Sequence, residues 1–147
     1  MARILAIDYG KKRTGLAVTD PQQIIANGLT TVETHQLETF LADYVRKEKV
    51  ERIVVGTPLQ NDGTASENMR RIEPFVNRLH KLFPDIPVEL YDERFTSVLA
   101  HHAMLEGGLK KKARQNKALV DEISACIILQ SYMESIRIRQ NEQTTTI

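Results

Sequence analysis

Residues 4–20 constrain the fold more than any other stretch of the sequence. Two apolar runs flank a short turn that carries an acid at its entrance, two glycines and three consecutive cations. Because the first run is too continuously apolar for a strand with one solvated face, we expect a central strand of an α/β sheet, covered on both faces. Asp8 then ends this strand, at the edge where open α/β sheets place ligand chemistry. The stretch predicts a β-hairpin that presents a carboxylate.

The turn of this hairpin favours metal or phosphate chemistry near Asp8. Gly10 and Gly15 are expected to adopt positive φ and to bring backbone N–H groups close to a bound group. Positive charge beside them comes from Lys11, Lys12 and Arg13. An ordinary hairpin with an aspartate in its turn is the alternative, because aspartate and glycine favour turns in any case.

Apolar and β-branched runs predict three further strands, at residues 24–32, 52–56 and 88–91. Between the first two, apolar positions spaced three and four residues apart predict a helix over residues 37–45, with Thr34 as its N-cap. The crossovers that follow require parallel neighbours, whereas the opening hairpin is antiparallel. We therefore predict one α/β domain with a mixed, five-stranded sheet and helices on both faces, a three-layer α/β/α arrangement.

A second amphipathic pattern runs from Ser66 or Met69 to residue 83. Pro74 interrupts it, and because proline lacks an N–H group, the helix must kink there or begin near Glu73.

The C-terminal third is predicted to contain a short helix over residues 96–106, a mobile basic loop and a long apolar helix. The loop at residues 109–117 has five cations and no acid. The long helix is expected to run from about residue 118 to residue 136 or 138. Polar residues then predict a frayed tail, so that a domain of residues 1–139 is followed by a tail of residues 140–147.

Composition limits the class of protein. The 147 residues, with 41% hydrophobic and 27% charged residues, are typical of a soluble globular domain. The single cysteine, Cys126, is expected to pack in the core, which suits a reducing compartment. No apolar run is long enough for a membrane span or a signal peptide, so we expect a cytoplasmic protein without a membrane partner. The net charge is only +1, so attraction to nucleic acid requires local clusters of cations.

Acidic residues stand at three places where the predicted elements begin or end. Asp8 ends the first strand, Asp92 and Glu93 end the last strand, and Asp121 lies near the start of the long helix. Converging carboxylates repel unless a divalent cation neutralises them, and hard oxygen ligands suit Mg²⁺ or Mn²⁺. Such a cluster can hold two ions about 4 Å apart for phosphodiester displacement, which is nuclease chemistry. Solvated strand ends, or a pairing of Asp121 with Arg94 or backbone, are the alternatives.

Several motifs, in this order along the chain, resemble the YqgF (RuvX) family over nearly the whole sequence. They are Asp8-x-Gly10 with Gly15-x-Ala17, Gly56-Thr57-Pro58, Asp92-Glu93-Arg94-x-Thr96-Ser97, and Lys117-x-x-Val120-Asp121 followed by Ile127-Ile128-Leu129-Gln130. The resemblance implies an RNase H-like fold and a nuclease that processes the 5′ end of pre-16S rRNA in ribosome biogenesis. Holliday-junction resolution on DNA is the older proposal for the family.

The resemblance also implies roles for single residues. Asp8, Glu93 and Asp121 would be the catalytic, metal-binding acids, while Gly56 and Pro58, like Gly10, would shape neighbouring loops. The choice between Asp92 and Glu93 stays open, because a shift of one residue in register exchanges the two faces of a strand. Oligomeric state, monomer or homodimer, also stays open.

Clustered cations are the candidates for binding nucleic acid. They are Lys11, Lys12, Arg13, Arg94, Lys110, Lys111, Lys112, Arg114 and Lys117. The segment at residues 110–117 is expected to bind the substrate backbone, with a solvated charge run as the alternative.

Two other functions compete with a nuclease. An actin-like ATPase or sugar kinase also begins with an Asp-x-Gly hairpin, but it has two lobes and a second phosphate-binding hairpin, which this sequence lacks. A non-catalytic RNA-binding module of ribosome assembly would keep the fold and the basic segment without the chemistry. Metal-dependent cleavage that is lost on substitution of Asp8 distinguishes the nuclease from both.

Overall fold

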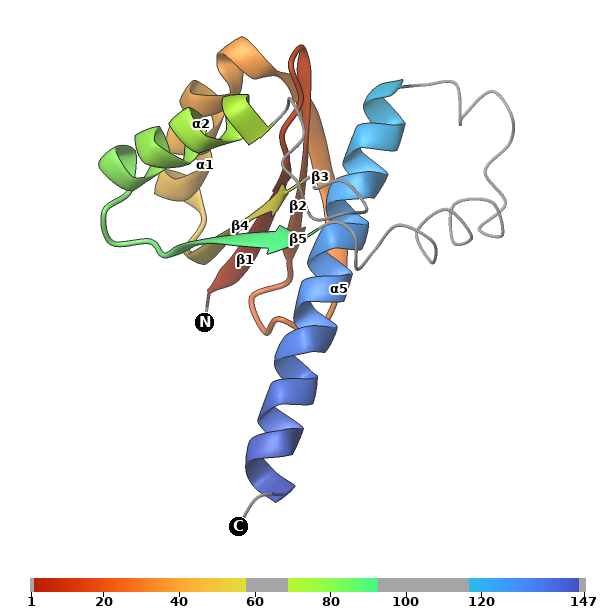
Figure 1. Ribbon diagram of the computed structural model, residues 1–147. Helices are drawn as coiled ribbons and strands as arrows, with labels where there is room; N and C mark the ends of the chain where they lie inside the picture. Colours follow the sequence, from red (N-terminus) through yellow and green to blue (C-terminus); the bar gives the residue numbers. More distant parts are fainter. Residues whose placement is uncertain (1, 58–68, 93–116, 146–147) are drawn as a thin grey trace.

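The computed structural model describes residues 2–57, 69–92 and 117–145 and places five strands in one mixed sheet (Figure 1). In chain order the strands are β1 (Arg3–Asp8), β2 (Arg13–Thr19), β3 (Ala26–Glu33), β4 (Val50–Thr57) and β5 (Val88–Asp92). Their spatial order is β3-β2-β1-β4-β5, with β1 antiparallel to β2 and parallel to β4. The predicted mixed sheet and the hairpin of β1 and β2 are confirmed.

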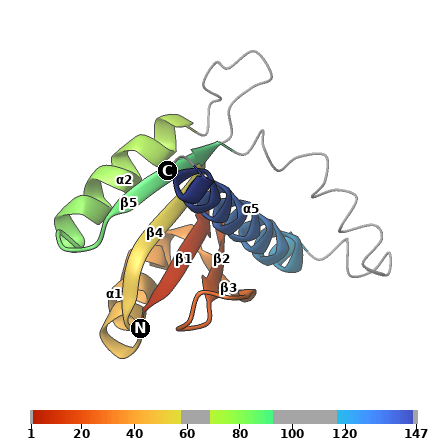
Figure 2. The ribbon, with the colours of Figure 1, turned by 90° about the horizontal axis from the view of Figure 1, so that it is seen from below.

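Helices cover both faces of this sheet, as predicted. One face carries α1 (Leu37–Lys47), which follows the short 3₁₀ helix η1 (Thr34–Gln36), and α2 (Met69–Leu82). The other face carries the long helix α5 (Lys117–Thr145), and Figure 2 shows the sheet between the two helical layers. In the part of the chain that the structure describes, no helix is long and apolar enough to cross a membrane.

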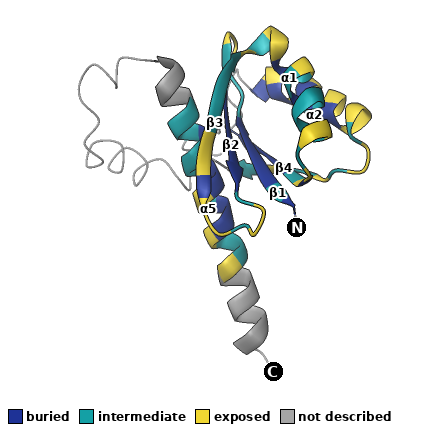
Figure 3. Ribbon diagram, turned by 180° about the vertical axis from the view of Figure 1, so that it is seen from behind, coloured by how far each residue is buried: buried dark blue, intermediate teal, exposed yellow. Residues whose placement is uncertain are grey.

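Strand β1 is buried on both faces, which explains its uninterrupted apolar run. Leu5 and Ile7 belong to the core beneath α1 and α2, whereas Ile4 and Ala6 belong to the core beneath α5. Side chains alternate between the two faces of a strand, so the faces of the next residues along the chain can be assigned from these four. Figure 3 shows the buried strands and the exposed outer surfaces of α1 and α2.

Small side chains let α5 approach the sheet closely. Its interface contains Ala6, Ala17 and Ala26 from the sheet, and Ala125 from the helix. Cys126 packs against this cluster as predicted, and its burial raises the pKa of the thiol.

Helix α5 is longer than the sequence predicted. It continues to Thr145, well past residues 136–138, and projects beyond the sheet in Figure 1. Residues 139–145 contain neither glycine nor proline, and glutamine and glutamate are good helix formers, so nothing in the sequence stops the helix.

One other local prediction is wrong, and one of two alternatives is excluded. Thr34 does not cap the first α-helix, which begins after Gln36 without a side-chain cap. The helix start near Glu73 is also excluded, because α2 includes Met69 and Pro74 lies inside it. Since proline has no N–H group, one backbone hydrogen bond of α2 cannot form at this position.

Strand β3 contains a bulge opposite Leu16 and Ala17 of β2. Leu16 pairs with Thr30 and Ala17 with Gly28, so β3 has one extra residue at this point. Predictions for residues 58–68 and 93–116, among them the short helix and most of the basic loop, lie outside the described residues.

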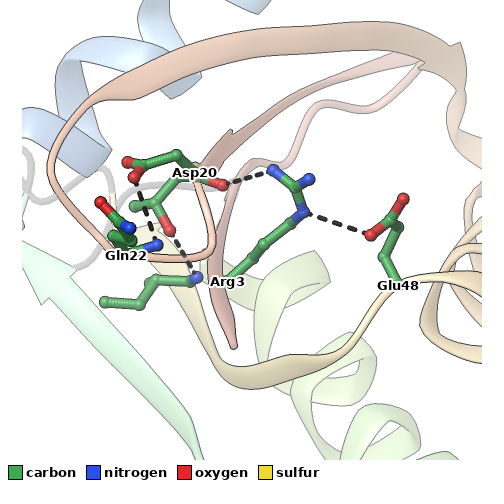
Figure 4. Close-up of polar contacts among 6 residues, drawn as sticks. Arg3, Asp20, Gln22 and Glu48 are labelled. Carbon is green, nitrogen blue, oxygen red and sulfur yellow. Dashed lines mark hydrogen bonds and ion pairs between the residues drawn. The ribbon is translucent and has the colours of Figure 1, made fainter. Parts of the chain in front are cut away.

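Arg3 anchors the end of the sheet opposite the hairpin turn. Its guanidinium donates a hydrogen bond to the carbonyl of Thr19 (2.9 Å) and lies 3.4 Å from the carboxylate of Glu48 (Figure 4). Asp20 accepts hydrogen bonds from the backbone of the following loop, including the N–H of Gln22 (3.2 Å). These contacts fix the start of β1 and the end of β2. The candidate site lies at the opposite end of the sheet, where β1 ends and β2 begins.

Candidate active site

Asp8 is the last residue of the central strand β1 and lies on the face covered by α5. Ile4 and Ala6 contact α5, so alternation directs the side chain of Asp8 to that same face. Tyr9 points to the other face, where its ring stacks on Phe75 with 4.6 Å between the centroids. The side chain of Asp8 is half-buried. The predicted position of Asp8 at a carboxyl strand end is therefore confirmed.

Glycines flank Asp8 on both neighbouring strands. Gly15 of β2 lies directly opposite Asp8 in the antiparallel pair. In the parallel pair Ile7 is aligned with Val55, and one further step along the register brings Gly56 beside Asp8. Residues aligned in this way have side chains on one face of the sheet, so neither neighbour places a side chain next to the carboxylate. Glycine inside a strand often marks a place where a ligand approaches closely.

One of these glycines has a position different from the predicted one. Gly15 lies inside β2, whereas the sequence placed it in the turn, and Gly56 lies inside β4, in agreement with the strand predicted at residues 52–56. Gly10 does lie in the turn, but its φ is outside the left-handed region, so the prediction of positive φ is wrong for it. Glycine is required there because a Cβ atom would lie 2.2 Å from the carbonyl oxygen of Arg13.

The end of β5 lies at the same edge of the sheet as Asp8. Asp92 is aligned with Thr57, the last residue of β4, and the Thr57 hydroxyl donates to the carbonyl of Tyr91 (3.1 Å). The structure describes the backbone of Asp92 but not its side chain, and Glu93 and Arg94 lie outside the described residues.

Asp121 lies in the second turn of α5. Its backbone position is four residues before Ala125, a fully buried residue that packs against Ala6 and Ala17. Residues four apart share one face of a helix, so position 121 continues the face that meets the sheet. In Figure 1 the first turns of α5 lie at the end of the sheet that carries the β1–β2 turn. The structure thus brings the elements that carry Asp8, Asp92 and Asp121 to one edge of the sheet.

Polar contacts hold α5 against β5. The Tyr91 hydroxyl is 2.6 Å from the hydroxyl of Ser131, and the Tyr91 ring meets Tyr132 edge-on at 5.9 Å. Tyr132 donates to Glu89 (2.5 Å) and accepts from Arg52 (2.5 Å). Burial, followed by the Glu89 hydrogen bond, raises the pKa of Tyr132, so the hydroxyl stays protonated at neutral pH. These contacts set the position of α5 relative to the strand that leads to Glu93.

The hydroxyl of Thr34 fastens the β1–β2 turn. It donates to the carbonyl of Gly10 (2.7 Å) and lies 3.0 Å from the hydroxyl of Thr14. No sequence pattern indicated this contact, because the pattern of a helix cap has no information about the distant turn.

Only some of the predicted cations are described. Lys11 and Lys12 are exposed at the tip of the turn, and Arg13 begins β2. Lys117 is the first residue of α5 and not part of a loop. The other candidates, Arg94, Lys110, Lys111, Lys112 and Arg114, lie outside the described residues, as does Pro58.

A metal site is compatible with the donors at this edge of the sheet. Among the residues whose side chains are described, no three His, Cys, Asp or Glu residues are grouped to hold an ion. That set contains Asp8 but neither Glu93 nor Asp121. Carboxylates are the ligands that Mg²⁺ and Mn²⁺ prefer, and the glycines beside Asp8 leave room on this face.

Sequence reasoning missed Glu122, which follows Asp121. A Cβ atom at Gly28 of β3 would lie 2.5 Å from a carboxylate oxygen of Glu122, so glycine at that position lets this acid pack on the sheet. Tyr91 and Ser131 were also missed. The only signal for Tyr91 was its place directly before the acidic pair.

Comparison with solved structures assigns this architecture to a class of proteins. RuvC of T. thermophilus, solved with a Holliday junction substrate, aligns over 92% of this chain and 96% of its own, with a TM-score of 0.57 and 16% identity. The Fowlpox virus resolvase, solved with Holliday junction DNA, covers 91% and 98%, with a TM-score of 0.58 and 13% identity. At such low identity the likeness concerns the fold alone, and that fold is the RNase H-like α/β fold of RuvC-type resolvases.

Sequence comparison identifies the family within this class. A family model for RuvX, described as Holliday junction resolvase, matches residues 2–135, so the chain belongs to the RuvX family. A relative from Phocaeicola vulgatus is 76% identical over 135 residues, 92% of this chain and 97% of its own. One from Bacteroides fragilis is 67% identical over 138 residues, 94% and 100% of the two chains. Both relatives carry the name "Putative pre-16S rRNA nuclease". The resemblance drawn from the ordered motifs is confirmed.

Proposed function

We propose that this protein is a nuclease that hydrolyses phosphodiester bonds at the 5′ end of pre-16S rRNA. The observation that carries the proposal is the setting of Asp8, a carboxylate at the end of the central strand with glycine on both neighbouring strands. The end of β5 and the first turns of α5 supply further acidic positions at the same edge. Membership of a nuclease family supports the same chemistry.

Asp8, Glu93 and Asp121 would hold Mg²⁺ or Mn²⁺. When bound, two such ions stabilise the charge on the attacking and leaving oxygens of the phosphodiester. Glu93 fits this role better than Asp92 does. Glu89 and Tyr91 both contact α5 residues, so the alternation of β5 assigns position 92 to the face opposite Asp8, which argues against Asp92 as the ligand.

Pre-rRNA is the preferred substrate because the relatives from Phocaeicola vulgatus and Bacteroides fragilis are named for it. Holliday junction DNA is the second candidate, and the description of the family model favours it. The basic residues 110–117 are assigned to the phosphate backbone of either substrate. An rRNA substrate also agrees with the cytoplasmic location expected from the lone cysteine.

A cleavage assay distinguishes these substrates. The purified protein would be given a labelled RNA with the pre-16S 5′ end, or a four-way DNA junction, in Mg²⁺, in Mn²⁺ or in EDTA. We expect metal-dependent cleavage of the RNA and none in EDTA. Preferential cleavage of the junction would instead make the protein a resolvase, and failure to cut either substrate would favour a binding module of ribosome assembly.

Asp8→Asn is the test of the site itself, since it removes the charge and keeps the shape of the side chain. The matched control is Asp43→Asn, on the far side of the sheet, where Asp43 pairs with Arg46 and Lys47 of its own helix. We expect Asp8→Asn to abolish cleavage and Asp43→Asn to leave it unchanged. Equal activity in the two variants would contradict the proposed site.

A further inference from the structure

A large pocket lies on the face of the sheet opposite Asp8, between the β1–β2 turn and α2. Its volume is about 890 Å³, and we call it the hairpin pocket after the turn that borders it. Its walls include Tyr9, Lys11, Lys12, Arg13, Phe75 and Arg78. Pockets for small ligands span roughly 300–1,000 Å³, so one or two nucleotides fit in this volume.

The charge of the hairpin pocket is positive. Of its two acids, Glu38 is paired with Arg78, while Glu33 lies 3.4 Å from His35 and is aligned with Arg13 across β2 and β3. Lys11 and Lys12 are exposed, and neither forms an ion pair with any residue that the structure describes. Two positive charges are therefore available to a bound anion.

An aromatic pair forms part of the pocket wall. Phe75 is almost completely buried, and the half-buried ring of Tyr9 stacks on it with an interplanar angle of 26°. The Arg78 guanidinium lies over the Phe75 ring, 6.0 Å from its centroid. Rigid aromatic rings beside lysines are the combination that proteins use for unpaired bases and their phosphates.

The chain connects the hairpin pocket directly to the candidate active site. Asp8 and Tyr9 are consecutive residues on opposite faces of the sheet, with Cα atoms about 3.8 Å apart. The turn of residues 10–12 forms the edge between them. A nucleic-acid strand at Asp8 can therefore pass over the turn and enter the pocket.

We propose that the hairpin pocket binds single-stranded nucleic acid next to the scissile phosphate, with a base against Tyr9 and phosphates on Lys11 and Lys12. This inference rests on the proposed nuclease function and specifies its substrate. Bases within a duplex are stacked on each other and do not reach such a ring, so the substrate must have an unpaired segment beside the cleaved bond.

Binding of a short fluorescein-labelled RNA, measured by anisotropy in EDTA, tests this proposal without cleavage. Tyr9→Leu keeps an apolar side chain on Phe75 but removes the aromatic ring. Since stacking on one base is worth about 1–3 kcal/mol, the affinity for single-stranded RNA should fall roughly 5- to 150-fold. Tyr9→Phe should bind like the wild type, and duplex RNA should bind equally to all three proteins.

The double variant Lys11→Ala/Lys12→Ala tests the phosphate contacts. Each lost phosphate contact reduces the log–log salt dependence on single strands by about 0.7, so the slope should flatten by up to about 1.4. The matched control is Lys49→Ala/Lys81→Ala, two exposed lysines that do not line the pocket. The control double variant should keep the wild-type salt dependence and the wild-type rate of single-turnover cleavage.

Unchanged single-strand affinity in both Tyr9→Leu and Lys11→Ala/Lys12→Ala would overturn the proposal. Displacement of the RNA by an equimolar amount of ATP would also overturn it, since the pocket would then be a site for free nucleotides. Failure of the nuclease proposal has a different signature, namely unaltered cleavage by Asp8→Asn, and does not change these binding results.

Discussion

Two glycines of the sheet lie beside Asp8, the acid at the end of the central strand. On the α5 face, Asp8 has Gly15 on one side and, one step along the register, Gly56 on the other. Strands normally disfavour glycine, because it adds no packing and costs conformational entropy. Its presence on both sides of one carboxylate is therefore better explained by access to Asp8 than by stability of the sheet.

Gly15→Val tests this interpretation. The branched side chain would stand next to Asp8 on the same face of the sheet, so we expect single-turnover cleavage to fall at least about tenfold, the equivalent of about 1.4 kcal/mol. The control is Thr30→Val on β3, aligned with Leu16 and thus on the opposite face. A Gly15→Val protein that is folded and cleaves at the wild-type rate would show that the space beside Asp8 has no role.

The acidic pair Asp92 and Glu93 gives a second prediction at the residue scale. Glu93→Gln and Asp121→Asn should each abolish metal-dependent cleavage, because each removes a proposed ligand charge. Asp92→Asn should retain most activity, because alternation assigns residue 92 to the opposite face from Glu89 and Tyr91. The rates can be compared in Mn²⁺ at saturating substrate. Loss of activity in Asp92→Asn, with activity kept in Glu93→Gln, would reverse the assignment.

At the scale of elements, the strands could be predicted from the sequence because the residue patterns that indicate a strand are local. The apolar run of β1, the short buried run of β4 and the alternation before Asp92 each depend on neighbouring residues only. The end of α5 was missed because no glycine or proline marks it. The role of Thr34 was missed because its hydroxyl contacts the carbonyl of Gly10, 24 residues away.

Parts of the candidate site could likewise be predicted from local sequence, and other parts could not. Asp8 could be selected from sequence because it follows a buried strand. The glycines beside it could not be recognised as its neighbours, because that requires the register of β1 with both β2 and β4. The contact of Tyr91 with Ser131 depends on how α5 packs on the sheet, and no local pattern contains this information.

Helix α5 is positioned by the hydroxyl of Tyr132, which leads to a prediction about stability. Tyr132→Phe removes the link between Arg52 and Glu89, although these two side chains also lie 3.6 Å apart. A hydrogen bond between such partly exposed groups contributes about 0.5–1.5 kcal/mol, and we expect a decrease of at least this size in the free energy of unfolding, measured by urea denaturation.

Tyr44→Phe is the matched control for Tyr132→Phe. Tyr44 packs against Phe40, and its hydroxyl has no hydrogen-bond partner among the described residues, so its removal should change stability little. Equal stability of the two variants would show that the Tyr132 contacts do not fix α5.

For the whole molecule, the sheet separates two functions. The acids are assigned to the α5 face and the hairpin pocket lies on the α1 and α2 face, with the β1–β2 turn between them. We assign Asp8 to a cluster of carboxylates that holds divalent metal. Without metal such carboxylates repel one another, and a bound ion relieves this repulsion.

Thermal melting with and without Mn²⁺ tests this claim most directly, because it requires no substrate. At an Mn²⁺ concentration 100 times the dissociation constant, binding contributes about 2.7 kcal/mol, which corresponds to a rise in Tm of roughly 5–10 °C for a protein of this size. We predict that rise for the wild type and for Asp43→Asn. Asp8→Asn should melt at a higher temperature than the wild type in EDTA and gain little from Mn²⁺. An equal response of wild type and Asp8→Asn to Mn²⁺ would show that Asp8 is not a metal ligand.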